Sequence, residues 1–479
     1  MGGLAARRRR NIWVGFSIAL VVLLVASGAV LLALKPWTDD FRHGGLTIAA
    51  PPAPVRPFPQ VAPAPSNAPA PTPAGIAAAL AAVVGNPDLG AFAGSVSDAD
   101  SATVLWSGDA NKPMIPSSTA KILTTATALL TLPQDHRVTT RVVAGSTPNE
   151  LVLVGGGDPT LTAQPDGKGY YPNGPRLSDL VAQIHAAGRA VDTIVVDISA
   201  FAGPTMAPGW EPVDIPEGSI APIEPVMIDG GRLDPLVEYS PRTATPALDA
   251  GRRLATELGL DPGRVRIGTA GPGAQQIASV QSVPLRDRLR EMMVHSDNVL
   301  AEAIGREIAA ATGAEPSFTG AVAAVTAALS RAGFDLTGMS MQDNSGLSTE
   351  DRVPPRLLDK ILATAAKPSG SSAVRPSNTM ARPETDRLAV TLAPLLDDLP
   401  VAGATGSLAG RYVSRDRAGA GWVRAKTGTL SVASTLVGYV LDHDGRVLTF
   451  ALMSNDRPPE ASRPALDAIA GTLRNCGCS

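Results

Sequence analysis

The sequence is poor in the residues on which several common classes of protein depend. Its 479 residues include only two cysteines, Cys476 and Cys478, one residue apart. This pair builds no disulfide framework, and we expect a frayed terminus there rather than a metal-binding or redox-active tail. Aromatic residues make up 4% of the chain and the net charge is −3, so neither base stacking nor electrostatic attraction predicts binding to nucleic acid.

Two motifs of well-known hydrolases are also missing. The sequence has no His-Glu-x-x-His motif and no paired-cysteine site, so we expect neither a metal nor another cofactor. It has no Gly-x-Ser-x-Gly motif, which argues against a Ser-His-Asp triad. His295 directly precedes Ser296, but adjacent residues on a helix do not face one another and so do not form a Ser–His pair.

One long hydrophobic run follows a basic segment. Residues 7–10 are all arginine, and residues 12–34 contain no charged residue. As a helix, residues 12–34 would measure roughly 35 Å, enough to cross the hydrocarbon core of a membrane. We interpret residues 1–11 as a cytoplasmic segment and 12–34 as a single-pass anchor, with the remainder extracytoplasmic, because basic flanks stay inside. A cleaved signal peptide is the alternative.

Proline and alanine dominate the next segment, residues 35–75. Proline fixes φ and lacks an amide donor, so this stretch forms neither a sheet nor a continuous helix. A polyproline-like conformation extends about 3.1 Å per residue. We therefore expect an extracytoplasmic spacer between the membrane and a globular part that begins near Gly75.

Three short motifs carry the groups of an acyl-transfer site. They are Ser118-Thr119-Ala120-Lys121, Ser296-Asp297-Asn298 and Lys426-Thr427-Gly428-Thr429. A serine becomes a useful nucleophile when a neighbouring base takes its proton. Residues three apart share a face of a helix, which predicts that the lysine of the first motif reaches its serine. A second serine, an amide and a second Lys–Thr pair complete the set that penicillin-interacting serine enzymes use.

The order of predicted strands and helices favours an α+β fold. Predicted strands at 91–96 and 103–106 precede a largely helical middle, and further strands follow at 422–430, 434–441 and 447–455. An antiparallel sheet built from both sets, with helices between them, is an α+β pattern.

The first two motifs are 178 residues apart, more than one helical subdomain requires. We therefore expect a catalytic domain in two parts, 76–145 and 279–479, with an inserted domain at 146–278.

With these motifs in this order, the chain resembles the low-molecular-mass penicillin-binding proteins of the DacB-type D-alanyl-D-alanine carboxypeptidase/endopeptidase family. The resemblance spans about residues 80–475 and includes the stretches 157–161, 197–201, 207–210 and 343–348. It implies a penicillin-binding/serine β-lactamase-like transpeptidase fold interrupted by an inserted domain. The insertion is shorter than in the longest relatives, so a third domain is missing or reduced.

Chemistry and the resemblance together give each catalytic residue a role. Ser118 would attack the carbonyl between two D-alanines, and Lys121, held neutral by burial and by nearby Lys426, would accept the serine proton. Ser296 would relay a proton to the leaving group. Asn298 would bind the substrate amide and orient Lys121.

The remaining predicted residues bind substrate. Lys426 would supply positive potential, Thr427 and Thr429 would hold the terminal carboxylate, and Gly428 would let the substrate strand approach the backbone closely. The backbone N–H groups of Ser118 and Thr429 would form the oxyanion hole. Asp197, from the inserted domain, would face a substrate side chain, although a purely structural role is an equal alternative.

These assignments predict a serine-type D-alanyl-D-alanine carboxypeptidase. It would trim peptidoglycan stem peptides, with DD-endopeptidase activity as an addition, and β-lactam antibiotics would be its covalent inhibitors. The alternatives are a serine β-lactamase and a catalytically inactive cell-wall-binding protein of the same fold. A β-lactamase needs a carboxylate that activates water, and Glu302, four residues after Asn298, is expected to be structural instead.

Overall fold

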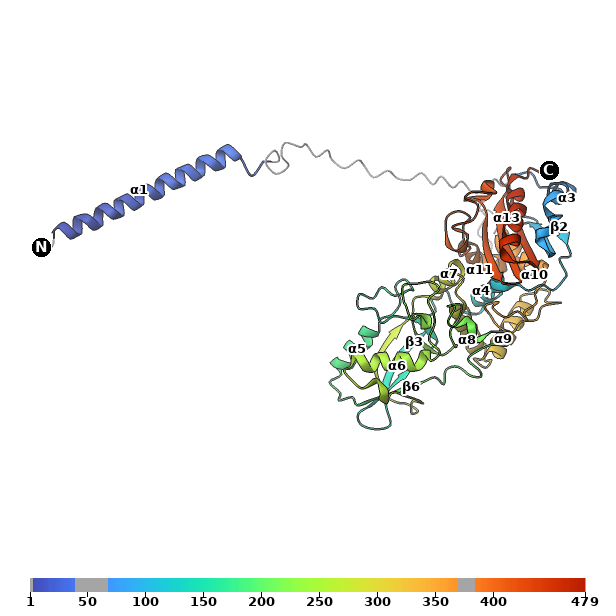
Figure 1. The fold of residues 1–479 in the computed structure, drawn as a ribbon, viewed down its shortest axis with the longest axis horizontal. Coiled ribbons are helices and arrows are strands. Elements are labelled where there is room, and N and C mark those ends of the chain that lie inside the picture. Colours follow the sequence, from blue (N-terminus) through green and yellow to red (C-terminus); the bar gives the residue numbers. More distant parts are fainter. Residues whose placement is uncertain (1–2, 39–67, 369–383, 479) are drawn as a thin grey trace, which may run out of the picture. The chain divides into compact units, whose positions relative to one another are not determined.

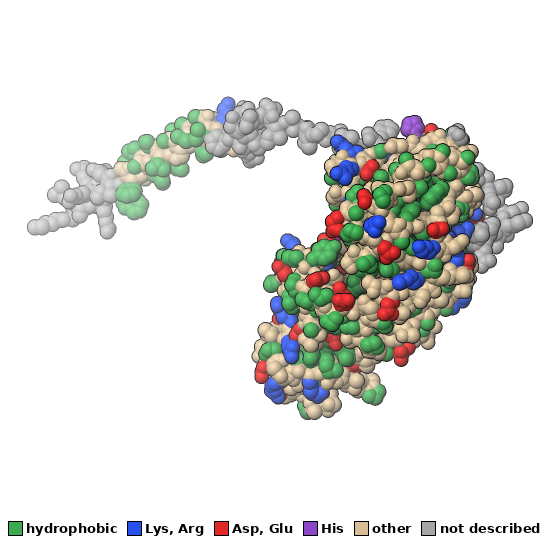
Figure 2. All heavy atoms as spheres, turned by 45° about the vertical axis from the view of Figure 1, so that its right-hand side comes forward, with side chains coloured by type: hydrophobic (Ala, Val, Ile, Leu, Met, Phe, Trp, Pro, Cys, Tyr) green, Lys and Arg blue, Asp and Glu red, His purple; other side chains and the backbone are tan. Residues whose placement is uncertain are grey.

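The computed structural model describes residues 3–38, 68–368 and 384–478. The chain divides into two units, Met1–Pro63 and Ala64–Ser479, which we describe separately (Figure 1). In the first unit, helix α1 covers Gly3–Leu34, and its segment Trp13–Leu34 has a mean hydropathy of 2.7 and apolar side chains along its length (Figure 2). By length and composition α1 can cross a membrane, a property that signal sequences share. Most of the expected spacer, residues 39–67, lies outside the described residues.

The second unit contains the expected antiparallel sheet, in the strand order β10-β11-β12-β1-β2. Its strands are β1 (Ala91–Asp98), β2 (Thr103–Gly108), β10 (Arg424–Leu430), β11 (Ala433–Leu441) and β12 (Val447–Asn455). β1 pairs with β12 from Ala91 opposite Asn455 to Asp98 opposite Leu448, which joins the early and late strands. The third motif lies on β10, at the edge of the sheet.

Helices cover both faces of this sheet. On one face α3 (Pro73–Val84) and α13 (Pro459–Asn475) pack around Leu436, and on the other α10 (Pro355–Ala366) contacts β1 and β12. The helical layer beyond α10 consists of α4 (Lys121–Thr131), α7 (Leu285–Val294), α8 (Asn298–Ala311), α9 (Phe318–Arg331), α11 (Glu384–Leu392) and α12 (Pro394–Asp397).

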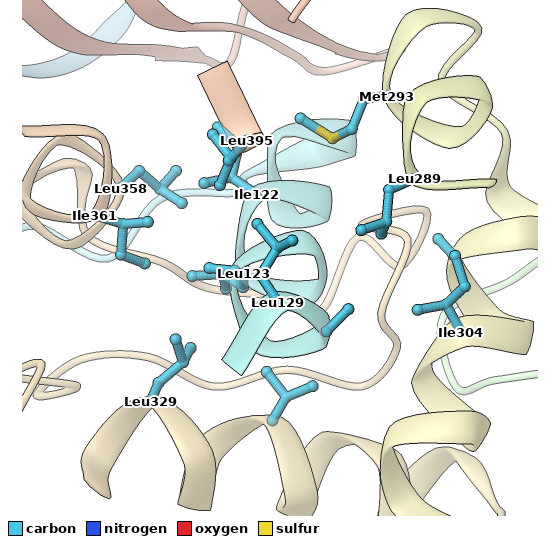
Figure 3. Packing of buried hydrophobic residues seen from close by; sticks show 14 of the residues in the cluster. Ile122, Leu123, Leu129, Leu289, Met293, Ile304, Leu329, Leu358, Ile361 and Leu395 are labelled. Atoms are coloured by element: carbon cyan, nitrogen blue, oxygen red, sulfur yellow. The ribbon is translucent and has the colours of Figure 1, made fainter. Parts of the chain in front are cut away.

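Helix α4 lies inside this layer. Ile122, Leu123 and Leu129 of α4 pack among apolar side chains of its neighbours (Figure 3). Nine of its eleven residues, 121–129, are buried. A core of this density holds the start of α4, where the first motif lies, in a fixed position.

The inserted segment forms a second five-stranded sheet, in the order β8-β6-β4-β3-β9. Its strands are β3 (Thr139–Ala144), β4 (Glu150–Val154), β6 (Thr193–Asp197), β8 (Arg266–Gly268) and β9 (Gln276–Gln281). β4, β6 and β8 are parallel, whereas β3 is antiparallel to both β4 and β9. Helices α5 (Leu177–Ala186) and α6 (Pro246–Glu257) pack against this sheet around Leu153 and Val196.

This sheet extends beyond the expected insertion of 146–278. It begins at Thr139 and ends at Gln281. Because β3 and β9 pair with each other, the chain leaves and re-enters the catalytic part side by side, and we propose 139–281 as the bounds of the inserted domain. Between β6 and α6 lies a long irregular segment, residues 198–245, whose regular elements are the short β7 (Val226–Ile228), paired with β5 (Asp158–Leu161), and two 3-10 turns.

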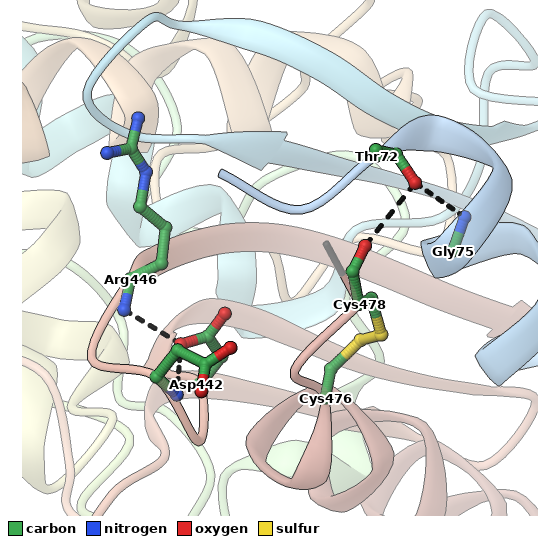
Figure 4. Close-up of a disulfide and its surroundings, with 7 residues drawn as sticks. Thr72, Gly75, Asp442, Arg446, Cys476 and Cys478 are labelled. Atoms are coloured by element: carbon green, nitrogen blue, oxygen red, sulfur yellow. Dashed lines mark hydrogen bonds between the residues drawn. A yellow bond between two sulfur atoms is a disulfide. The ribbon is translucent and has the colours of Figure 1, made fainter. Parts of the chain in front are cut away.

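The expectation of a frayed C-terminus is wrong as far as residue 478. Cys476 and Cys478 form a disulfide beside the start of α3 (Figure 4). The amide of Thr72 donates to the carbonyl of Cys478 at 2.8 Å, and the amide of His443 donates to the carbonyl of Cys476 at 3.0 Å. Main-chain hydrogen bonds to two other elements therefore hold this segment, which a composition argument does not reveal.

Candidate active site

The first motif lies where a 3-10 turn enters a buried helix. The turn covers Ser117–Ala120, and α4 begins at Lys121. Ser118 thus lies in the turn that precedes the α-helix. The Nζ atom of Lys121 is 3.0 Å from the Oγ atom of Ser118, and the lysine side chain is fully buried. This distance allows direct proton transfer between the two groups.

The second motif connects α7 to α8. Ser296 has a φ of +59°, a conformation in which its hydroxyl lies 2.8 Å from the Nζ atom of Lys426. Asp297 is the N-cap of α8 and accepts a hydrogen bond from the amide of Leu300 at 2.9 Å, which supports a structural role for its carboxylate. The Oδ1 atom of Asn298 accepts a hydrogen bond from Lys121 at 2.6 Å.

The third motif is on the edge strand β10, beside the nucleophile. Lys426 is fully buried and also donates to the carbonyl of Thr427 at 2.9 Å. The hydroxyl of Thr427 donates to Ser407 at 2.6 Å. Sequence reasoning did not identify Ser407, because a lone serine in a loop carries no signature.

Gly428 is also required for packing within the protein. A Cβ atom at this position would lie 2.1 Å from the Oγ1 atom of Thr435 and 2.8 Å from both the carbonyl of Pro116 and the Cβ of Ser117. The absent side chain therefore lets β10 pack against the turn that carries the nucleophile. The close approach is between two parts of the enzyme itself.

A tight loop, residues 343–348, supplies the third contact of the catalytic lysine. Lys121 donates to the carbonyl of Ser345 at 2.8 Å. The fully buried carboxylate of Glu302 accepts hydrogen bonds from the amides of Asn344 (2.9 Å) and Ser345 (2.8 Å), while Asp343 accepts those of Ser345, Gly346 and Ser348. Glu302 is thus structural, as expected, although it is buried and holds a loop. The sequence of this loop contributed to the family resemblance, but it did not predict that the carbonyl of Ser345 contacts Lys121.

The inserted segment contributes three contacts to the second motif, one of which is the hydroxyl of Tyr171, which donates to Asp297 at 2.9 Å. The carbonyl of Ser219 accepts a hydrogen bond from the Nδ2 atom of Asn298 at 2.9 Å, so the amide is held from both sides. Arg232 donates to Asp297 at 3.2 Å and to the hydroxyl of Tyr171 at 3.1 Å, and its guanidinium lies 3.4 Å from the ring centroid of Tyr170. None of these contacts could be predicted from a local sequence pattern.

Burial sets the protonation of the two lysines. Burial lowers the pKa of Lys121 to about 8, against the opposing effect of the carboxylates of Asp343, Asp297 and Glu302. Burial, together with the charge on Lys121, lowers the pKa of Lys426 well below its ordinary value. The sequence had suggested that burial and nearby Lys426 together act on Lys121. Burial lowers the pKa of Lys121 as expected, whereas the repulsion between the two lysines lowers the pKa of Lys426.

Asp197 does not reach this site. It ends strand β6, and its two carboxylate oxygens accept hydrogen bonds from the amides of Ser199 and Ala270, both at 2.8 Å. Its side chain therefore ties the irregular segment to the strand end. Nothing in this geometry offers the carboxylate to a ligand.

The motifs open onto one cleft with a volume of 1290 Å³. Its wall contains Ser118, Ser296, Asn298, Thr427 and Thr429, and it also includes residues of the inserted segment between 209 and 242. The cleft is large enough for a peptide. Across the part of the chain that the structure describes, no group of three or more His, Cys, Asp or Glu side chains is placed to hold a metal ion.

Known proteins share this architecture. Penicillin-binding protein 4 of Haemophilus influenzae superposes with a TM-score of 0.65 at 19% identity, over 82% of this chain and 97% of that one, which shows the penicillin-binding type of α+β fold. A protein of Mycolicibacterium smegmatis named carboxypeptidase DacB is 46% identical over 98% of both chains, and a carboxypeptidase of Mycobacterium tuberculosis is 47% identical over 91% of this chain and 92% of its own. The model of the D-Ala-D-Ala carboxypeptidase 3 (S13) family matches residues 76–241, 236–380 and 384–476. The chain therefore belongs to the D-Ala-D-Ala carboxypeptidase 3 (S13) family of peptidases.

Proposed function

We propose that the chain is a serine-type DD-carboxypeptidase that removes the terminal D-alanine from peptidoglycan stem peptides through an acyl-enzyme on Ser118. One observation carries the proposal: the buried amine of Lys121, with a pKa of about 8, lies 3.0 Å from the hydroxyl of Ser118, which lines the cleft. Hydrogen bonds to Asn298 and to the carbonyl of Ser345 hold this amine in place. The base is thus already positioned before substrate binds, as efficient general-base catalysis requires.

The first half of the reaction uses this pair. Neutral Lys121 accepts the proton of Ser118 as its oxygen attacks the carbonyl carbon between the two D-alanines. The amides of Ser118 and Thr429 are the donors we assign to the oxyanion, an interaction worth about 3–4 kcal/mol per donor. The tetrahedral intermediate collapses when the C–N bond breaks. The proton that Lys121 took from Ser118 passes through the hydroxyl of Ser296 to the amine of the departing D-alanine, which leaves Lys121 neutral again; Lys426, 2.8 Å from that hydroxyl, orients it.

The second half returns the enzyme to its starting state. A water molecule attacks the acyl-enzyme ester, Lys121 accepts a proton from that water, and the Ser118 oxygen regains a proton as it leaves. One peptide bond and one water are consumed, and the products are the shortened peptide and D-alanine. We assign binding of the terminal carboxylate of the substrate to Thr427 and Thr429, which lie on the same strand as the buried Lys426.

The geometry favours this function over a β-lactamase. β-Lactams would acylate Ser118 as substrate mimics, and rapid turnover of that acyl-enzyme would need a carboxylate that activates water. Glu302, the candidate for this carboxylate because it follows Asn298 by four residues, is buried, and it accepts hydrogen bonds from amides of the 343–348 loop. An intact network around Lys121 likewise disfavours an inactive wall-binding protein.

We further propose that α1 anchors the enzyme in the cell membrane, with residues 7–10 inside and the catalytic unit outside. The support is the length and apolar composition of Trp13–Leu34 and the preceding arginines. Sequencing the N-terminus of the mature protein distinguishes this anchor from a cleaved signal peptide.

Acylation by a fluorescent penicillin and release of D-alanine from a D-Ala-D-Ala peptide test the catalytic proposal. We expect Ser118→Ala to abolish both, with the adduct in the wild-type protein on the Ser118 peptide. Lys426→Ala should slow acylation by roughly 10²-fold, the cost of one charge-assisted contact. Labelling that persists in Ser118→Ala, or penicillin turnover at the ordinary enzymatic rate of about 1–10³ s⁻¹, would contradict the proposal.

A further inference from the structure

One arginine of helix α13 lies beside the end of the third motif. The Nε atom of Arg463 donates to the Oγ1 atom of Thr429 at 3.3 Å. The arginine side chain is exposed, and both residues line the catalytic cleft. A guanidinium from a second element thus reaches the threonine to which we assign the substrate carboxylate.

The neighbouring Arg411 forms an ion pair with a carboxylate, whereas Arg463 feels the charges of Glu460 and Asp467 only from a greater distance. Arg411 forms a two-pronged ion pair with Asp467, with distances of 2.9 and 2.6 Å. Among the described residues, no carboxylate lies within ion-pair distance of the Arg463 guanidinium. Burial and the charge of Arg411 lower the pKa of Arg463, while the charges of Glu460 and Asp467 act in the opposite direction. The Arg463 guanidinium, without a carboxylate in direct contact, lines the cleft beside Thr429, a position that favours the approach of an anion.

Lys426 alone is a poor source of fixed positive charge. It is fully buried, it already contacts Ser296 and the carbonyl of Thr427, and burial works against its protonation. A guanidinium remains protonated under these conditions, and its planar fork matches the two oxygens of a carboxylate. Arg463 therefore supplies what the buried lysine lacks.

We propose that Arg463, together with Thr429, binds the terminal α-carboxylate of the substrate and selects peptides that end in a free carboxylate over those that end in a carboxamide. The inference rests on the proposed function of the cleft. Arg463 acts here as a specificity-determining residue, since it contacts the part of the substrate that leaves with D-alanine.

The test compares two peptides that differ only at the terminus, D-Ala-D-Ala carboxylate and D-Ala-D-Ala carboxamide. We expect Arg463→Gln to lower kcat/KM for the carboxylate peptide by about 10- to 100-fold and to leave the carboxamide peptide nearly unchanged. Arg463→Lys keeps the charge without the fork and should show a smaller loss, again confined to the carboxylate peptide. Arg457→Gln is the matched control, because Arg457 is exposed, contacts the carbonyl of Pro87 and lies outside the cleft wall.

The outcomes separate this inference from the proposed function. If the wild-type protein releases no D-alanine, the proposed function fails. If the wild-type protein is active but Arg463→Gln loses nothing, or loses equally on both peptides, the carboxylate role of Arg463 is wrong. Thermal unfolding of each variant shows whether it is folded, and should Arg463→Gln not fold, the peptide selectivity of Arg463→Lys decides the question in the same way.

Discussion

The two five-stranded sheets of this protein serve the active site in different ways. The sheet of the catalytic part is entirely antiparallel and carries Lys426 on its edge strand β10. The sheet of the inserted part contains the parallel strands β4, β6 and β8 and carries none of the three motifs. Its contribution comes from irregular segments, through Tyr171 between β5 and α5 and through Ser219 and Arg232 after β6.

The difference shows that the catalytic part carries the reacting groups, whereas the inserted part helps to position them. Reacting groups lie on or directly beside regular elements packed in a dense core, which holds their distances fixed. The cleft wall that the inserted part contributes is built from loop, and polar contacts attach it to the second motif. We therefore expect changes in the catalytic part to affect acylation directly, and changes in the inserted part to act mainly through stability.

The largest expected effect is the pH dependence of acylation. Because burial lowers the pKa of Lys121 to about 8, the neutral amine that acts as the base predominates above that pH. Below it, the acylation rate should fall about tenfold per pH unit, since the base is lost in proportion to the proton concentration. Second-order rates of penicillin acylation between about pH 5.5 and 9.5 measure this profile.

The free energy of unfolding should not show the same pH dependence as the acylation rate. Below pH 8, Lys121 is protonated in the folded and unfolded states alike, so this group makes no pH-dependent contribution to the free energy of unfolding there. Asp297 has a pKa below its ordinary value because Arg232 and Arg242 outweigh its burial, so the ion pair of the inserted part persists. An acylation rate that is flat between pH 6 and 8 would contradict the role of Lys121.

The next effect concerns the ion pair between Arg232 and Asp297. Both side chains are 2% exposed, so Arg232→Ala leaves a buried carboxylate without its main partner. The free energy of unfolding should fall by about 3–5 kcal/mol. Under conditions where the variant is folded, acylation should fall by about tenfold, because Asp297 lies between Ser296 and Asn298.

A matched variant on the surface of the inserted part gives the control. Arg252 pairs with Asp249 at 2.9 Å, but the two side chains are 48% and 41% exposed. Arg252→Ala should therefore cost less than about 1 kcal/mol and leave acylation unchanged. Equal losses for the two variants in chemical denaturation would show that Arg232 has no special role.

The part of this architecture that could be read from the sequence is the part with local signatures. The spacing of Ser118 and Lys121 predicted their contact, and apolar runs bounded by turn residues predicted the strands of the first sheet. The Ser219 and Ser345 carbonyls could not be predicted, since any residue type supplies a backbone carbonyl. The ion pair between Arg232 and Asp297 could not be predicted either, because Arg232 belongs to the inserted part and contacts Asp297 only in the folded chain.

Asp197 tests how far resemblance to relatives can substitute for geometry. The resemblance placed its carboxylate against a substrate side chain, whereas in the structure both oxygens accept backbone amides of Ser199 and Ala270. Asp197→Ala should leave these two donors without their acceptor and reduce the free energy of unfolding by about 1–3 kcal/mol. D-Alanine release by the folded variant should be unchanged. A tenfold loss of kcat/KM at unchanged unfolding temperature would instead favour the substrate role, and would mean that the wall of the inserted part binds ligand directly instead of only supporting the catalytic part.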